Sequence, residues 1–358
     1  MTSTVESIRG RTVESRHAVS AAVVDADGTL VAGTGNPDLV TYWRSCAKPI
    51  QVLPLLTDGA ADALGIDDAE IAVACASHNG EPRHVAVVEG LLRKAGCTES
   101  DLACGPHPSL SPAVARAMAE RGEKPRRIHS NCSGKHAGML AMARHHGWPT
   151  ADYRHAGHAV QRRVHEEVLL WTGVPESGLH TGTDGCGVVS FALPLRNMAL
   201  AYARLGARVD PAGAAQLGVK GVKGVGSANP YTPHPTPYTR SSAADRVIRA
   251  IFSDPFLVAG TGRLCTEVAA GSGGRVLAKI GAGGVYCALI PEARLGLALK
   301  VEDGDDESAR VALVALLDAL VPGVVRVPDA FRSPAHKNTL GEEVVHVVAR
   351  ISLERAVH

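Results

Sequence analysis

The chain has 358 residues, of which 45% are hydrophobic and 20% are charged, a composition that can bury the core of one large domain or of two ordinary ones. Its 37 Lys and Arg residues balance 36 Asp and Glu residues, so no net charge favours nucleic acid or an anionic membrane as a partner. We therefore expect a compact globular protein that binds a small molecule.

The N-terminal stretch MTSTVESIRGRTVESRH has no apolar core of the kind found in signal peptides. No later stretch approaches the roughly 20 apolar residues of a membrane span. The eight cysteines are scattered along the chain without the dense spacing of a disulfide scaffold. These features predict a cytoplasmic protein with reduced thiols, most of them small core residues.

The first half of the chain changes from strand to helix patterns. Residues 17–35, HAVSAAVVDADGTLVAGTG, are two Val-rich runs joined by Asp27-Gly28, which predicts an antiparallel hairpin. From Ser45 to about Leu200, four stretches carry apolar residues at helical spacing and end at glycine: residues 81–96, 111–122, 135–147 and 158–173. The middle of the chain is therefore predicted to be mainly helical.

The second half returns to strand patterns. Residues 218–240 mix Gly and Pro without apolar periodicity, as in a loop or linker. Residues 242–255 and 305–321 have helical spacing, whereas 274–291, 294–304 and 341–353 read as single strands. The prediction is an α/β (α+β) fold, with an antiparallel sheet from residues 1–44 and 241–358 flanked by helices and a mainly helical region, 45–240, inserted into it. We expect one compact two-lobed unit.

Ser45 and Lys48 lie three positions apart in TYWRSCAKPIQVLPLL, where a hydroxyl and an amine share one helix face. A lysine buried beside apolar residues can serve as the base for such a serine. The alternative is a capped helix start with a solvated lysine, and this spacing alone favours that alternative.

Two further stretches bear on this choice. Ser77 and Asn79 flank His78 just before a predicted helix; the alternative role for Asn79 is an N-cap. Lys279 lies late in a predicted strand and precedes Gly281, where a ligand can approach the backbone closely. The three motifs, SxxK, SxN and K-x-G, occur in the order typical of the serine β-lactamase and penicillin-binding superfamily. Ile280 stands where that superfamily has a hydroxyl, which argues against β-lactam recognition.

A cluster of cysteines forms the remaining feature. Cys132 and Lys135 lie in HSNCSGKHAGML, and Cys186 follows Asp184 in a glycine-rich turn. Two thiols with acidic and basic neighbours suit zinc. Alternatives are two small buried cysteines, or a Cys132 nucleophile with Lys135 or His136 as its base.

Taken together, ESRH, YWRSCAKPIQ, ASHNGE, HSNCSGKHAGML, DGCG, GTGR and KIGAGG resemble the rhizobial-type L-asparaginase II family over nearly the whole chain. The resemblance implies a serine β-lactamase-like fold and hydrolysis of L-asparagine to L-aspartate and ammonia. It also implies a nucleophile, Ser45, with Lys48 as its base, and a second pair of Ser77 with Lys279. Zinc would be bound by the side chains that match the family's ligands, namely Cys132, Lys135 and Cys186.

Several further residues are candidates for binding the substrate. Arg44 and Arg263 are candidates for binding the α-carboxylate, and the resemblance gives Asp184 a role beside the metal or at the substrate amine. Backbone N–H groups near Gly281 are candidate oxyanion donors, and Asn79 is a further substrate residue. We expect a homodimer with L-asparagine as substrate. The competing hypotheses are a penicillin-binding or β-lactamase-like acyl enzyme and a zinc-stabilised binding protein without catalysis.

Overall fold

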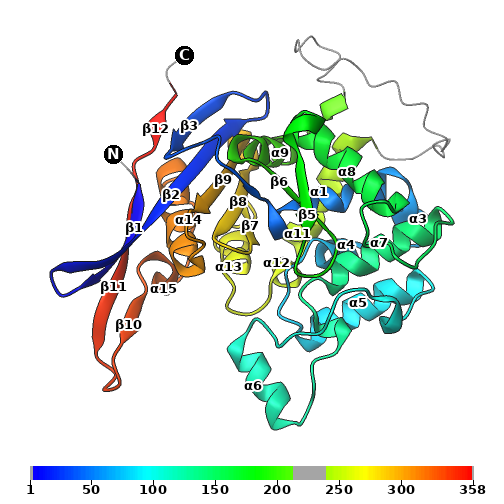
Figure 1. Ribbon diagram of the computed structural model, residues 1–358, viewed down its shortest axis with the longest axis horizontal. Helices are drawn as coiled ribbons and strands as arrows, with labels where there is room; N and C mark the ends of the chain where they lie inside the picture. Colours follow the sequence, from blue (N-terminus) through cyan, green and yellow to red (C-terminus); the bar gives the residue numbers. More distant parts are fainter. Residues whose placement is uncertain (1–2, 213–238, 357–358) are drawn as a thin grey trace. The chain divides into compact units, whose positions relative to one another are not determined.

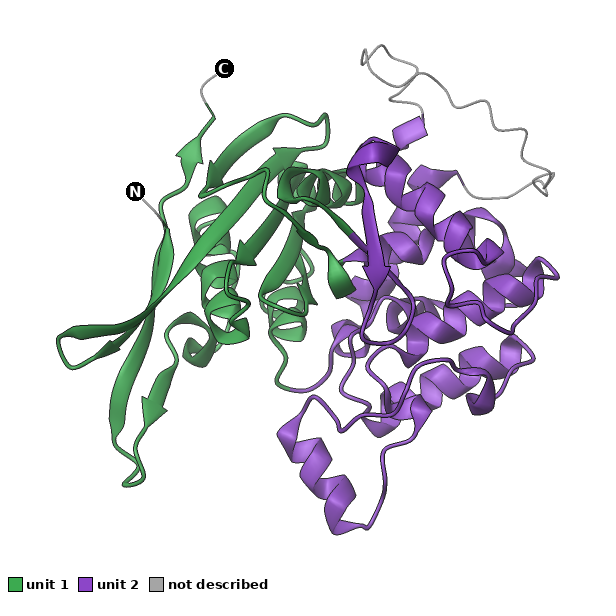
Figure 2. Ribbon diagram, viewed as in Figure 1, with its two compact units in different colours: residues 1–46, 192–207, 262–358 green, residues 47–191, 208–261 purple. Residues whose placement is uncertain are grey.

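The computed structural model describes residues 3–212 and 239–356. The predicted loop 218–240 lies outside these residues except for its last two positions. The chain divides into two compact units (Figures 1 and 2): unit 1 comprises residues 1–46, 192–207 and 262–358, and unit 2 comprises residues 47–191 and 208–261. Helices and an antiparallel sheet are both present, which confirms the predicted mixed α/β class.

Unit 1 contains a sheet built from both ends of the chain. The strand order is β10-β11-β1-β2-β9-β8-β7, with β3 beside β2 and β12 beside β3, and neighbouring strands pair in the antiparallel direction. The strands of this sheet are β1 (Thr4–Arg9), β2 (Thr12–Asp25), β3 (Leu30–Thr34), β7 (Leu277–Gly281), β8 (Val285–Ile290), β9 (Leu295–Val301), β10 (Ala335–Lys337), β11 (Glu343–Arg350) and β12 (Glu354–Arg355). The prediction of a sheet from both termini is confirmed.

Turn chemistry accounts for two hairpins in this sheet. The Asp27-Gly28 turn joins β2 to β3, with Gly28 at a φ of 98° that glycine adopts without strain. The stretch 274–291, predicted as one strand, instead forms β7 and β8, so that prediction is wrong. Gly283 and Gly284, with φ of 76° and 74°, reverse the chain inside a continuous apolar run, and apolar periodicity does not reveal such a turn.

Helices cover the sheet of unit 1. The helix α9 (Leu195–Ala207) packs on β2, β8 and β9, and α14 (Asp306–Leu320) packs on β1, β8, β9 and β11. A Cβ at Gly296 would lie 1.9 Å from the carbonyl oxygen of Ala199, so only glycine lets α9 approach β9 this closely. The smaller elements are β4 (Val40–Tyr42), α13 (Leu264–Gly271) and α15 (Asp329–Arg332).

Unit 2 is built mainly from helices. The four stretches that end at glycine form α5 (Pro82–Lys94), α6 (Pro112–Glu120), α7 (Ser133–His145) and α8 (Ala159–Thr172), as predicted. The other elements are α1 (Lys48–Gln51), α2 (Leu53–Thr57), α3 (Ala60–Ala63), α4 (Asp68–Ala74), β5 (His180–Thr183), α11 (Arg240–Ser253) and α12 (Pro255–Val258), with β6 (Val189–Pro194) running across the boundary between the units. A second sheet has the order β4-β6-β5, and its strands β5 and β6 lie within the range predicted as helical.

Assignment of helices to units depends on packing. The sequence placed residues 241–358 with the sheet, whereas α11 packs on α2 and α4 in unit 2. Conversely, α9 lies in the range assigned to the helical region and packs on the sheet of unit 1. Both helices are amphipathic, and an apolar face does not specify its partner.

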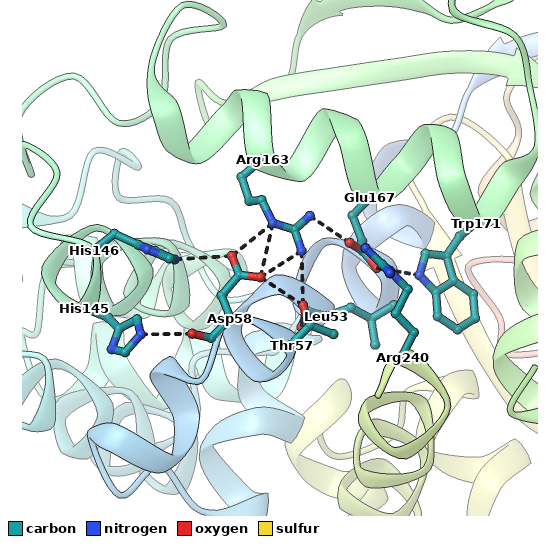
Figure 3. A network of polar contacts seen from close by, with 9 residues as sticks. All are labelled: Leu53, Thr57, Asp58, His145, His146, Arg163, Glu167, Trp171 and Arg240. Carbon is teal, nitrogen blue, oxygen red and sulfur yellow. Dashed lines mark hydrogen bonds and ion pairs between the residues drawn. The ribbon is translucent and has the colours of Figure 1, made fainter. Parts of the chain in front are cut away.

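A buried ion network holds unit 2 together (Figure 3). The Arg163 guanidinium donates to both carboxylate oxygens of Asp58 and, at 2.7 Å, to Glu167. Glu167 also accepts from Trp171 Nε1 at 2.7 Å and lies 3.4 Å from Arg240. The network therefore joins α2, α8 and α11.

Among the described residues, no helix combines the length and the apolar character needed to cross a membrane.

Candidate active site

Ser45 lies in a 3₁₀ turn, Arg44–Ala47, that directly precedes α1. Arg44 has a φ of 53°, a left-handed conformation that is uncommon for a residue other than glycine and that occurs at functional sites. The turn is anchored through Cys46, whose thiol donates to the Lys279 carbonyl oxygen at 2.9 Å and whose carbonyl oxygen accepts from Tyr202 Oη at 2.7 Å. Ser45 itself is half-buried. The hydrogen bonds of the buried Cys46 that follows it hold the turn in place.

Lys48 is buried, with 1% of its surface exposed, so the alternative of a solvated lysine does not apply. Its Nζ donates to the Ala76 carbonyl oxygen, to Ser77 Oγ at 3.1 Å and to the Asn131 carbonyl oxygen at 3.3 Å. A fixed, dry amine beside a serine hydroxyl is an arrangement suited to proton transfer. The structure thus brings Lys48 together with Ser77, which the resemblance had paired with Lys279.

The segment around Ser77 is held by its backbone. Ser77 N–H donates to the Val258 carbonyl oxygen and Asn79 N–H to that of Ala259, both at 2.9 Å. Helix α5 begins at Pro82 with Glu81 as its N-cap residue, so the alternative of Asn79 as the N-cap does not apply. Ser77 is 2% exposed, and its hydroxyl therefore points into a buried setting.

The His78 side chain stabilises the same turn through two hydrogen bonds. Its Nδ1 accepts from Gly80 N–H at 3.0 Å, and its Nε2 lies 3.0 Å from Ser133 Oγ. Because Nδ1 accepts, the proton of the neutral ring resides on Nε2, which donates to Ser133. Burial, together with the charges of His84 and Lys48, holds the pKa of His78 well below its usual value.

Lys279 lies on β7 and is fully buried, with its Nζ donating to the Ile280 carbonyl oxygen at 3.2 Å. Gly281, two residues after Lys279, has a packing role that the sequence did not indicate. A Cβ at Gly281 would lie 2.8 Å from the Trp43 carbonyl oxygen and 3.1 Å from Cys46 Sγ. The absent side chain therefore lets the Ser45 turn pack against β7.

Cys132, Lys135 and Cys186 come together in unit 2. Lys135 Nζ lies 3.1 Å from Cys186 Sγ, the Cys132 thiol hydrogen-bonds to Cys186, and Asp184 Oδ2 lies 3.8 Å from that sulfur. The hydrogen bond from Cys132 and the charge of Lys135 outweigh burial and lower the pKa of Cys186 to about 5. The same hydrogen bond and burial raise the pKa of Cys132 to about 12.

This donor set consists of two sulfurs and one nitrogen. Within residues 3–212 and 239–356, no group of three His, Cys, Asp or Glu side chains is arranged to hold a metal. The third donor of the thiol cluster is a lysine, so the cluster is not a group of that kind. Lys135 must lose its proton to bind a metal; burial opposes its charge, whereas the two cysteines and Asp184 raise its pKa.

The sequence of the chain matches one known protein family. Residues 5–349 match the family model described as L-asparaginase II. The chain belongs to the L-asparaginase II family. The family is one of L-asparaginases, which are amidohydrolases.

Two other comparisons accompany this assignment. No curated protein matches the chain. Among solved structures, Mglu in its native form matches with 14% identity and a TM-score of 0.36, over 87% of this chain and 62% of Mglu. A β-lactamase from Mycobacterium bovis matches with 18% identity and a TM-score of 0.37, over 84% of this chain and 94% of its own. The chain thus spans less than two thirds of Mglu.

In this L-asparaginase II family member, Glu81 has a structural role that the sequence did not predict. Its carboxylate accepts from Asn79 Nδ2 at 2.9 Å, from Thr261 N–H at 2.9 Å and from Thr261 Oγ1 at 2.8 Å. Burial alone would raise the pKa of Glu81, but these hydrogen bonds outweigh it and lower the pKa. The only signal in the sequence was its place in ASHNGE, immediately before a helix.

The remaining substrate candidates lie in different elements. Arg263 precedes α13 in unit 1, and Arg44 lies in the Ser45 turn. Asp184 lies in the turn after β5, where its carboxylate accepts from Gly185 N–H at 2.9 Å. Asn79 Nδ2 donates to Glu81 and, at 3.1 Å, to the Thr261 carbonyl oxygen.

Proposed function

We propose that this L-asparaginase hydrolyses the side-chain amide of L-asparagine through a serine nucleophile, Ser45, activated by Lys48. The observation that carries the proposal is the buried Lys48 amine, which hydrogen-bonds Ser77 Oγ at 3.1 Å. Lys48 also stands three residues after Ser45, the spacing that suits a serine and its base. A lysine in this setting can exchange a proton with one hydroxyl after another.

The proposed reaction has two stages. Ser45 Oγ bonds to the amide carbon, its proton passes to a neutral Lys48, and the C–N bond breaks as ammonia leaves with a proton delivered through Ser77. A water then repeats the sequence on the acyl-enzyme and releases L-aspartate. Lys279, whose backbone carbonyl anchors the Ser45 turn, is proposed as the partner that keeps Ser77 in the proton path. Arg44, Arg263 and Asp184 are proposed to bind the charged ends of the substrate, together with Asn79 and the backbone at Gly281.

The test is ammonia release from L-asparagine and L-glutamine by single variants. Ser45→Ala should reduce kcat at least about 1000-fold, and Lys48→Met and Lys279→Met at least about 100-fold. Lys300→Met is the matched control, because Lys300 also lies on a strand of the same sheet and donates to a nearby backbone carbonyl, at 3.1 Å. Wild-type ammonia release by Ser45→Ala would refute the nucleophile, and covalent labelling of Ser45 by a fluorescent penicillin would support the β-lactamase-like alternative.

We also propose that Cys132, Lys135 and Cys186 bind zinc. The Cys186 sulfur already contacts both Lys135 Nζ and the Cys132 thiol, and zinc is commonly bound by three protein ligands with a fourth position open to water or substrate. Bound there, zinc would orient a water or polarise an oxygen of the substrate. The chemistry of the donor set therefore fits the metal.

Zinc binding has its own measurement, native mass spectrometry of the protein. Wild-type protein should bind about one zinc per chain, and Cys132→Ser and Cys186→Ser should lose it. Cys97→Ser, at another buried cysteine, should retain it. Chelation should raise KM for asparagine if the metal borders the substrate; a lower Tm with an unchanged KM would instead assign it a structural role. Metal bound equally by all three variants would refute the site.

A homodimer in the cytoplasm remains our expectation for this enzyme. Sedimentation of the purified protein tests the first part, and fractionation of cells tests the second.

A further inference from the structure

Ser15, His17 and Asp303 form a hydrogen-bonded chain in unit 1, separate from the residues discussed above. Ser15 and His17 lie on β2, and Asp303 lies in the turn after β9. His17 Nε2 is 3.3 Å from Ser15 Oγ, and His17 Nδ1 is 2.7 Å from Asp303 Oδ2. One ring nitrogen therefore contacts a hydroxyl and the other a carboxylate, which is the connectivity of a Ser-His-Asp triad.

Strand geometry explains why these side chains meet. Residues two apart on a strand point to the same face, so Ser15 and His17 are neighbours on β2. The pairing of Val19 with Val301 brings the turn after β9 beside His17. Next to Ser15, the register of β1 and β2 shifts after Ser7, and such bulges often re-aim a side chain beside an active site.

The proton positions follow from the carboxylate. The pKa of Asp303 is lowered, because the backbone N–H of Asp305 and the His17 ring outweigh the effect of its slight burial. An ionised carboxylate only accepts hydrogen bonds, so Nδ1 of His17 donates to it, and in the neutral form of the ring Nε2 is the acceptor that faces the Ser15 hydroxyl. The His17 side chain is 18% exposed and that of Asp303 52%, and Ser15 is half-buried, so all three residues are partly exposed to solvent.

We propose that Ser15 is a second nucleophilic serine, which accepts acyl groups from activated esters. In the step, a bond forms between Ser15 Oγ and the acyl carbon while the bond from that carbon to the leaving oxygen breaks. The hydroxyl proton passes to His17 Nε2 and then to the leaving alcohol or phenol. Asp303 is a positioning residue that holds the ring and balances its charge.

The experiment exposes the full-length protein to 4-nitrophenyl acetate and follows acetylation of each serine-containing peptide by mass spectrometry. Ser7 is the matched internal control, because it lies directly opposite Ser15 in β1. Ser15 should be acetylated at least about 100-fold faster than Ser7. His17→Gln should slow acetylation of Ser15 about 100-fold, and Asp303→Asn at least about 10-fold. Peptides that contain Ser45 are read separately, so the two serines are distinguished.

The alternative is that His17 and Asp303 merely staple β2 to the turn after β9. In that case Asp303→Asn would lower Tm and leave acetylation of Ser15 unchanged, which would overturn the proposal. Acetylation of Ser15 at the rate of Ser7 would overturn it as well. Because Asp303 is more than half exposed, Asp303→Asn should fold even if His17→Gln does not, and slower acetylation at an unchanged Tm would support the proposal.

Discussion

Glu81 connects the loop before α5, which contains Ser77, to the loop after α12. Its carboxylate accepts hydrogen bonds from Asn79, in the loop before α5, and from Thr261, in the loop after α12. Between them, Gly260 has a φ of 114°, and a Cβ there would lie 2.5 Å from Glu81 Oε1. The orientation of Asn79, a proposed substrate-binding residue, therefore depends on its hydrogen bond to Glu81, which is not itself proposed to bind the substrate.

Replacement of Glu81 by Gln should loosen these loops. The amide has one accepting oxygen where the carboxylate has two, so at least one donor from Thr261 or Asn79 loses its partner, at a cost of about 1–3 kcal/mol. We expect kcat/KM for asparagine to fall about 10-fold or more, and Tm to fall by a few °C. Glu89→Gln, the same change at an exposed position of α5, is the control. Equal kinetics for the two variants would contradict the role of Glu81.

At the scale of elements, helix α7 determines how the thiol cluster is placed. Its residues from Ser133 to Ala143 are all buried, with Lys135 in the first turn and Cys132 as the N-cap residue. A Cβ at Gly134 would lie 2.1 Å from the Val73 carbonyl oxygen of α4. The glycine between Cys132 and Lys135 therefore sets the distance between α7 and α4.

Two glycines of α7 provide a matched pair of tests. Gly134→Ala should push α7 away from α4 and lower the free energy of unfolding by about 1–3 kcal/mol. Gly138→Ala should be neutral or stabilising by up to about 1 kcal/mol, because its Cβ would lie 3.4 Å from the Ala74 Cβ, an ordinary contact. Urea denaturation measures both, and equal stabilities would show that α7 has room to shift.

At the scale of the whole molecule, the Asp58 network is the principal polar feature of the interior of unit 2 (Figure 3). Asp58 contacts Arg163 of α8 and, at 3.2 Å, His146 beyond the end of α7. Burial would raise the pKa of Asp58, but the hydrogen bond from His146 and the charge of Arg163 outweigh it and lower the pKa. Folding therefore favours the ionised carboxylate.

The pH dependence of stability follows from that direction. Since the pKa of Asp58 is lower in the folded state than the value of about 3.9 expected when unfolded, its contribution is complete above about pH 5 and is lost as the pH falls through the folded pKa. Asp58→Asn should lower the free energy of unfolding at neutral pH by about 1.5–3 kcal/mol, because the buried Arg163 loses one of its two carboxylate partners and keeps only Glu167.

The control is Asp245→Asn, which breaks an exposed pair with Arg208 and should cost at most about 1 kcal/mol. Chemical denaturation at pH 7 and pH 4 measures both variants. A loss at Asp58 no larger than at Asp245 would contradict the importance of the buried network.

The sequence by itself determined the features that depend on local chemistry or on a recognisable motif. Apolar spacing and terminal glycines predicted α5 to α8, the Asp27-Gly28 turn predicted the β2–β3 hairpin, and the ordered motifs indicated the family.

Only the tertiary structure decided which segments meet. It assigned α9 to the sheet and α11 to the helices, split residues 274–291 into two strands, linked Lys48 to Ser77, and gave Gly281 and Glu81 their packing and hydrogen-bonding roles. Each of these depends on contacts between residues far apart in the chain. A local pattern specifies the face that an element buries, but not the partner against which it is buried.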